Sequence, residues 1–212
     1  MQGGDDELVV TILFDNESTE DRLRSGWEFS ALLEAGGTTV LFDTGADGGA
    51  LLALGHRPRV HFLRAFPAEL RETAGRWAPV EDREPGEEIV PGIRSTGTMG
   101  RSIPEQAVVL DTREGAVVLT GCAHPDVVRM AEKPRELLGC PLHAVLGGFH
   151  LKDSSREEIR EVVEAFRRLG GNRAGPTHCS GHAATSAFRE TFGKDFLCLG
   201  VGRVLPFPLA GG

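Results

Sequence analysis

The sequence feature that most constrains the fold is the segment Val117–Pro125, which reads VVLTGCAHP. Its apolar run lacks the polar alternation of a half-exposed strand, which is typical of a strand buried on both faces. Gly121 allows a sharp turn where the strand ends, and Pro125 suits the first position of a helix. His124 is therefore expected at a strand-to-helix corner, where side chains project from a sheet into a crevice.

The same pattern, an apolar run, then Gly or Pro, then a polar residue, occurs at three other places, which present Asp43, His150 and His178. Neutral imidazole is the commonest ligand for zinc or iron, and catalytic sites commonly use three protein ligands with a position left for water. His124, His150 and His178 are therefore the predicted metal ligands. Asp43 is the predicted catalytic residue, either as a further ligand or as the acceptor that orients a ligating histidine.

A metal ion at such a site would lower the pKa of its bound water to about 7 and make hydroxide available as a nucleophile. This chemistry predicts a hydrolase-type site. Zinc is the first choice of cofactor, iron and manganese are the alternatives, and a form without metal is left open.

Chain length and charge limit the remaining possibilities. At 212 residues, the chain is expected to form a single domain over residues 1–212, with a core large enough to be stable without disulfide bonds or a structural metal ion. The net charge of −8 and the lack of a basic cluster argue against a nucleic-acid partner. Met1–Glu7 is acidic and no apolar run reaches membrane length, so we expect no signal peptide, no membrane partner, a cytoplasmic location and reduced cysteines.

Apolar periodicity predicts a β-rich first half followed by alternating strands and helices. The predicted strands are Glu7–Phe14, Thr38–Phe42, Val60–Phe66, Ile89–Thr96, Gln106–Leu110, Ala116–Thr120 and Phe196–Leu205. The predicted helices are Pro67–Trp77, a segment after His124 that runs to Leu138 and is interrupted by Pro134, Ser155–Leu169, and a segment from Gly181 or His182 to Phe192. The strongest helix is Ser155–Leu169, where Ser154 with Glu157, or Ser155 with Glu158, can form a capping box. The order indicates two sheets between helices.

Four segments resemble the metallo-β-lactamase-fold proteins: Leu41–Gly45 (LFDTG), Leu119–Pro125 (LTGCAHP), Gly147–Leu151 (GGFHL) and His178–Gly181 (HCSG). More narrowly, they are similar to the branch related to the ribofuranosylaminobenzene 5′-phosphate synthase of methanopterin biosynthesis. The resemblance runs from about Val9 to about Val204. It implies an α/β (α+β) fold, a metallo-β-lactamase-like αββα four-layer sandwich with a metal site along the common edge of the sheets. It also implies an anionic or phosphorylated substrate.

One departure from that family changes the expected site. The family's signature loop, His-x-His-x-Asp-His, is absent after the Asp-Thr-Gly segment, because only ADGGALLALGH stands between Gly45 and Arg57. Neither His56 nor His61 reproduces the spacing. We therefore expect a fold shortened in its N-terminal half and a site with at most one metal ion. A missing strand would leave apolar surface uncovered, which predicts a homodimer.

Simpler interpretations of the same residues stay open. His150 can be a core histidine, Asp43 can cap the loop that follows it, and Cys122 and Cys179 can be small buried apolar residues. Three functional classes follow from the sequence. The first is a metal-dependent hydrolase, and the second is a degenerate relative that keeps the fold and a binding pocket. The third is a thiol enzyme that uses Cys122 or Cys179.

Overall fold

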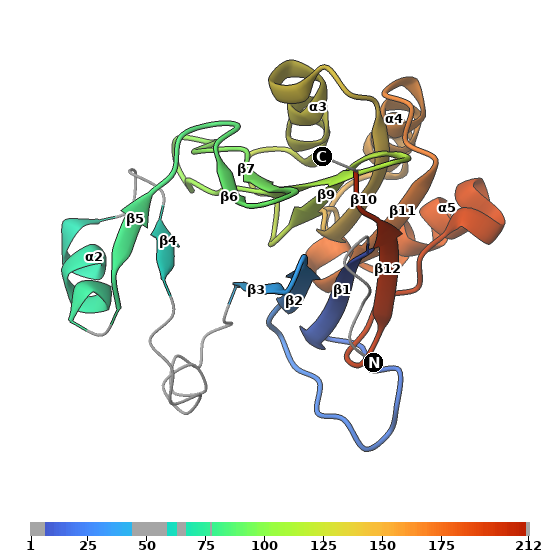
Figure 1. Cartoon of the computed structure of the whole chain (residues 1–212). Helices are drawn as coiled ribbons and strands as arrows, with labels where there is room; N and C mark the ends of the chain where they lie inside the picture. Colours follow the sequence, from blue (N-terminus) through green and yellow to red (C-terminus); the bar gives the residue numbers. More distant parts are fainter. Residues whose placement is uncertain (1–6, 44–58, 63–66, 77, 211–212) are drawn as a thin grey trace.

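A computed structural model of the chain describes residues 7–43, 59–62, 67–76 and 78–210 (Figure 1). Within these residues, the strands form a four-stranded sheet, a six-stranded sheet and a separate two-stranded sheet. The segment Gly45–Arg57, on which the sequence predicts a shortened loop, lies outside the described residues, and so does His56.

The four-stranded sheet joins the two ends of the described chain. It consists of β1 (Glu7–Phe14), β2 (Ser30–Ala35), β3 (Thr38–Phe42) and β12 (Val204–Pro208), in the order β12-β1-β2-β3. All its neighbours are antiparallel. Since β3 ends at Phe42, the next residue, Asp43, stands at the end of this sheet.

The six-stranded sheet carries the histidines of the predicted site. It runs in the order β11-β10-β9-β8-β7-β6 and consists of β6 (Glu88–Val90), β7 (Ile93–Ser95), β8 (Val108–Thr112), β9 (Gly115–Thr120), β10 (Leu142–Gly148) and β11 (Arg173–Thr177). The strands β9, β10 and β11 are parallel neighbours. Every residue of β9 and β10 is buried, as the unbroken apolar runs predict.

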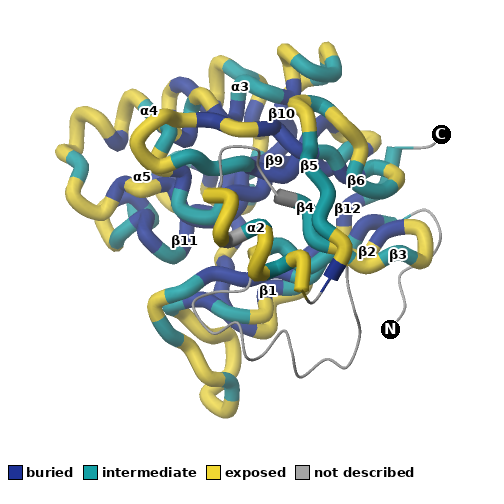
Figure 2. Tube along the Cα trace, turned by 90° about the vertical axis from the view of Figure 1, so that its left-hand side faces the viewer, coloured by how far each residue is buried: buried dark blue, intermediate teal, exposed yellow. Residues whose placement is uncertain are grey.

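Two layers of core hold this sheet between the other elements. On one face, Val117 and Leu119 pack with Leu8, Val10 and other residues of the four-stranded sheet. On the other face, Val118 packs with residues of the helices α3 (Val127–Leu138), α4 (Arg156–Arg168) and α5 (His182–Phe192). Figure 2 shows the buried residues, in dark blue, gathered along β9 and β10. Alternate residues of one strand thus serve two cores.

A small unit stands apart from both large sheets at the left of Figure 1. It contains β4 (Val60–Phe62), α2 (Ala68–Gly75) and β5 (Val80–Asp82). β4 and β5 pair in parallel, and Arg71 of α2 forms an ion pair of 2.5 Å with Asp82. The unit follows the part of the chain where the sequence predicts the shortening.

The structure confirms the α+β fold class with two stacked sheets, and it corrects three local predictions. The predicted strand Ile89–Thr96 is two strands, β6 and β7, because a turn places Gly92 at a φ of 77°. The predicted closing strand Phe196–Leu205 begins only at Val204, since the preceding residues cross between the sheets and pair through isolated bridges. The helix expected at Pro125 begins at Val127, because Asp126 is its N-cap.

Among the described residues, each helix is too short or too polar to span a membrane. Two short 3₁₀ turns flank α5, because η1 (His178–Ser180) precedes it and η2 (Gly193–Asp195) follows it. Of these, η1 lies at the end of β11 and carries His178.

The capping box of α4 gives a test of the fold. Ser155 Oγ accepts from the Glu158 amide at 3.2 Å, and Glu158 Oε2 accepts from the Ser155 amide at 2.7 Å. We expect Ser155→Ala to lower the free energy of unfolding by about 1 kcal/mol. Urea denaturation measures this change, and Ser154→Ala is the matched control with a change within about 0.5 kcal/mol. Equal losses in the two variants would contradict the assignment of the cap.

Candidate functional site

The candidate site lies where β9, β10 and β11 end. These strands lead into Gly121–His124, Phe149–His150 and His178. Because neighbouring strands lie about 4.8 Å apart and run in parallel, their carboxyl ends deliver side chains to one edge of the sheet. The three predicted histidines therefore come to the same edge.

The backbone at this edge is strained. Among the described residues, the non-glycine residues with positive φ are Asp43 (57°), Ala123 (62°), Asp126 (104°), His150 (54°) and His178 (53°). Each such residue costs about 1–3 kcal/mol and persists only where the surrounding structure imposes it. All five follow the ends of strands, and three of them are predicted site residues. The strain is thus concentrated where side chains are turned out of the sheets.

His124 and His150 form one pair at this edge. Their ring centroids lie 4.3 Å apart at an interplanar angle of 51°. The carboxylate of Glu105 contacts His124 Nδ1 and also accepts from the Ala123 amide at 2.9 Å. Burial, and then the nearby His124, lower the pKa of His150, which keeps its imidazole neutral at neutral pH. Neutral imidazole is the form that binds metal.

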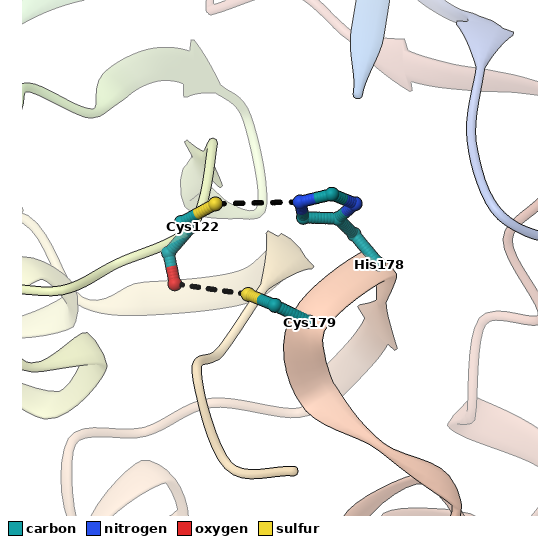
Figure 3. A group of neighbouring side chains, drawn as sticks. All are labelled: Cys122, His178 and Cys179. Carbon is teal, nitrogen blue, oxygen red and sulfur yellow. Dashed lines mark hydrogen bonds between the residues drawn. The ribbon is translucent and has the colours of Figure 1, made fainter. Parts of the chain in front are cut away.

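His178 is held from two sides. Its Nδ1 lies 3.1 Å from Asn16 Oδ1, and its carbonyl accepts from Asn16 Nδ2 at 2.8 Å. On the other side, its Nε2 lies 3.3 Å from Cys122 Sγ (Figure 3). The hydrogen bond with Cys122, followed by the charges of Cys122, Asp15 and Asp43, raises the pKa of His178. The ring of Trp27 lies 5.1 Å away, tilted by 41°.

The two cysteines of the site lie beside His178. Cys122 follows β9, whereas Cys179 is in η1, and the Cys179 thiol donates to the Cys122 carbonyl at 3.3 Å. The hydrogen bond between the two sulfurs raises the pKa of Cys122 and lowers that of Cys179.

Asp43 reaches this edge from the other sheet. A Cβ atom on Gly121 would lie 3.5 Å from Asp43 Oδ2, so the carboxylate faces the end of β9. Ser30 Oγ donates to the Asp43 carbonyl at 2.7 Å, which anchors Asp43 at the end of β3. Asp43 thus stands opposite the strand ends that carry the histidines, and its negative charge contributes to the raised pKa of His178.

Asp15 and Asn16 were not among the site residues predicted from the sequence. Asp15 is fully buried. Its Oδ2 accepts from Thr177 Oγ1 at 2.5 Å, and its Oδ1 accepts from the Asn16 amide at 2.7 Å. Burial raises the pKa of Asp15 despite these hydrogen bonds. The signal was present in the sequence, because Asp15 and Asn16 directly follow the apolar strand β1.

The structure divides the predicted ligands into two groups. His124 and His150 contact each other, and His178 contacts Cys122. Within the part of the chain that the structure describes, the group of three potential donors lying within 4.8 Å of one another is Cys122, His178 and Cys179. The shared set His124, His150 and His178 stays a prediction. Imidazole and thiol groups, with Glu105 and Asn16 orienting the rings, are donors that fit a divalent ion of the zinc type.

Comparison with known proteins gives one curated relative. Over 171 residues the chain is 31% identical to the 7,8-dihydropterin-6-methyl-4-(β-D-ribofuranosyl)-aminobenzene-5′-phosphate synthase of Methanocaldococcus jannaschii. The match covers 68% of this chain and 57% of the synthase, so the chain spans little more than half of that protein's length. No protein-family model matches the chain.

Two solved structures share the fold. A metal-dependent hydrolase of the β-lactamase superfamily superposes with a TM-score of 0.76 at 24% identity, over 93% of this chain and 98% of that one. The metallo-β-lactamase-fold protein YhfI from Bacillus subtilis superposes with a TM-score of 0.68 at 13% identity, over 95% and 99% of the two chains. At these identities the likeness concerns the fold alone.

The buried contact between Thr177 and Asp15 gives a second test. Thr177→Val removes a donor to a buried carboxylate, so we expect the free energy of unfolding at pH 7 to fall by about 1–3 kcal/mol. A group with a raised folded pKa stabilises the fold at low pH and loses that contribution as the pH rises through this pKa. Removing the donor raises the pKa of Asp15 further, so the loss should be smaller at pH 4 than at pH 7.

Urea denaturation at the two pH values measures this difference. Thr39→Val, at an exposed position of β3, is the control, with an expected change within about 0.5 kcal/mol at either pH. A loss in Thr177→Val that is the same at pH 4 and pH 7 would mean that Asp15 does not depend on this hydroxyl.

Proposed function

Since the chain is a metallo-β-lactamase-fold protein, we propose that it is a metal-dependent enzyme of the hydrolase type. Its substrate would be an anionic or phosphorylated small molecule, and its site would hold at most one metal ion. The ligands would be His124, His150 and His178, with Asp43 as the residue that orients a ligating imidazole. Zinc is the preferred ion, with iron or manganese as alternatives.

The observation that carries this proposal is the convergence of these residues. Three parallel neighbouring strands bring the histidines to one sheet edge, and β3 brings Asp43 to the end of β9. The imidazole rings of His124 and His178 are each held by a polar partner, Glu105 for His124 and Asn16 for His178. A ligating histidine usually needs such a partner on its second nitrogen, because the partner fixes the tautomer.

Groups that could bind an anionic substrate lie beside the same edge. Lys152 Nζ lies 5.3 Å from the centroid of the Trp27 ring, and the same ring lies 5.1 Å from His178. Trp27 is 62% exposed, so its ring is open to a ligand at this edge. Lys152 would bind a phosphate group of the substrate through its charge, and the Trp27 ring would stack against a flat ring of the substrate. The name of the 31% identical relative, a 5′-phosphate synthase, supports a phosphorylated substrate.

The bound ion would supply a water molecule whose pKa is lowered toward neutrality. The chain's own residues would do the rest of the work. Glu105 and Asn16 hold the rings of His124 and His178, and the carboxylate of Asp43 faces the end of β9. Lys152 and Trp27 would hold the substrate against this edge.

A second candidate function has one specific observation in its favour. His178 Nε2, the nitrogen that a shared metal would need, lies 3.3 Å from Cys122 Sγ. A chain that lost the signature loop and engages this nitrogen with a thiol could be a degenerate relative that binds a small molecule without hydrolysing it. The absence of both metal uptake and turnover would favour this second candidate.

Removal of single histidines tests the proposed enzyme. We expect the zinc-loaded protein to hydrolyse a phosphate ester such as bis(p-nitrophenyl) phosphate. His124→Ala and His150→Ala should each lower kcat/KM by about 100-fold or more, because a ligand is lost. The matched control is His182→Ala at the exposed start of α5, which should keep the wild-type rate within a factor of about two. Equal rates in all four proteins would overturn the proposed ligands.

A further inference from the structure

We propose that Cys122, His178 and Cys179 form a thiolate metal site that takes Zn²⁺ or another thiophilic divalent ion. This inference rests on the proposed function in one respect, namely that a divalent ion binds at this sheet edge, and it gives that ion a ligand set other than the three histidines proposed above. It differs in the donors, because two sulfurs would replace His124 and His150 as partners of His178. Two of its three protein ligands would be cysteines.

The distances between the three donors suit a single ion. Cys122 Sγ, His178 Nε2 and Cys179 Sγ all lie within 4.8 Å of one another, and the first two are 3.3 Å apart (Figure 3). In a tetrahedral zinc site, with bonds of about 2.3 Å to sulfur and 2.0–2.1 Å to nitrogen, neighbouring donors stand roughly 3.5–3.8 Å apart. The 3.3 Å between Cys122 Sγ and His178 Nε2 is already close to that spacing.

The sheet is shaped to let these donors meet. Cys122 follows β9 and Cys179 follows β11, and β10 runs between these two strands. The contact is made across the end of β10 at Gly148, where an added Cβ atom would lie 2.8 Å from Cys179 Sγ. Because a real Cβ essentially never comes so close, a side chain at Gly148 would push the sulfur away from Cys122.

His178 is oriented toward the sulfurs before any ion arrives. Asn16 Oδ1 can only accept, so the His178 nitrogen 3.1 Å from it, Nδ1, carries the proton. The lone pair of the neutral ring is then on Nε2, which faces Cys122. A partner on the second ring nitrogen that fixes the tautomer in this way is typical of a metal-binding histidine.

The donor types predict which ions bind. Thiolates select soft or borderline ions such as Zn²⁺ and Co²⁺ over Mg²⁺ and Mn²⁺. On binding one Zn²⁺, each thiol gives its proton to the solvent, so two protons are released per ion if both cysteines start protonated. A fourth position would remain for water or an anionic ligand, as in catalytic sites with two cysteines and one histidine.

Cobalt titration of the reduced full-length protein tests the site. Co²⁺ bound by thiolates gives an intense sulfur-to-cobalt absorption in the near ultraviolet, which imidazole ligands do not give. We expect this band to saturate at one Co²⁺ per chain and to be displaced by Zn²⁺. It should be absent in Cys122→Ser and Cys179→Ser, with an affinity loss of at least about 100-fold. It should persist in Cys140→Ser, Cys198→Ser and His124→Ala.

Thiol labelling of the wild-type protein keeps the test valid if a cysteine variant fails to fold. Zn²⁺ should protect Cys122 and Cys179 from alkylation and leave the exposed Cys198 reactive. Cobalt that binds without the sulfur band, and is lost in His124→Ala, would overturn this inference and leave the proposed function standing. Cobalt with the sulfur band but no hydrolysis would uphold the site and reject the enzyme. No binding at all would reject both.

Discussion

The hydrogen-bonded contact of three parallel strands, β9, β10 and β11, is the interaction on which the rest of this structure depends. Strands that pair in parallel end at the same edge, about 4.8 Å from their neighbours, whatever the chemistry of the residues that follow them. His124 and His150 meet because their strands are adjacent. His178 follows β11, and its ring contacts Cys122 of the β9 end across the end of β10.

The site's strained backbone depends on the packing beneath it. β9 and β10 are buried on both faces by two cores, so their ends cannot relax away from the edge. Polar anchors add to this support, with Asp15 holding Thr177 at the end of β11 and Glu105 holding Ala123. The positive φ angles of His150 and His178 can persist because these contacts impose them. The packing of the two cores thus fixes the positions of the donor side chains.

The sequence was sufficient to predict where the site residues stand, but not which of them meet. Unbroken apolar runs predicted β9 and β10, and the residues after them, together with Asp43 and His178, do lie at strand ends. Strand order and side-chain direction are long-range properties that no local pattern contains, so the contact of Cys122 with His178 was not foreseen. The position of Asp15 after an apolar strand was visible in the sequence, but its contact with Thr177, 162 residues away, was not.

The most direct measurement is an anomalous difference map, recorded at the zinc absorption edge, from a crystal of the zinc-loaded protein. The central claim, that the ends of β9, β10 and β11 together hold one divalent ion, predicts a single strong peak at this sheet edge. That peak should lie within about 2.0–2.3 Å of His178 Nε2. A map without a peak at this edge, or with zinc bound only elsewhere on the protein, would contradict the claim.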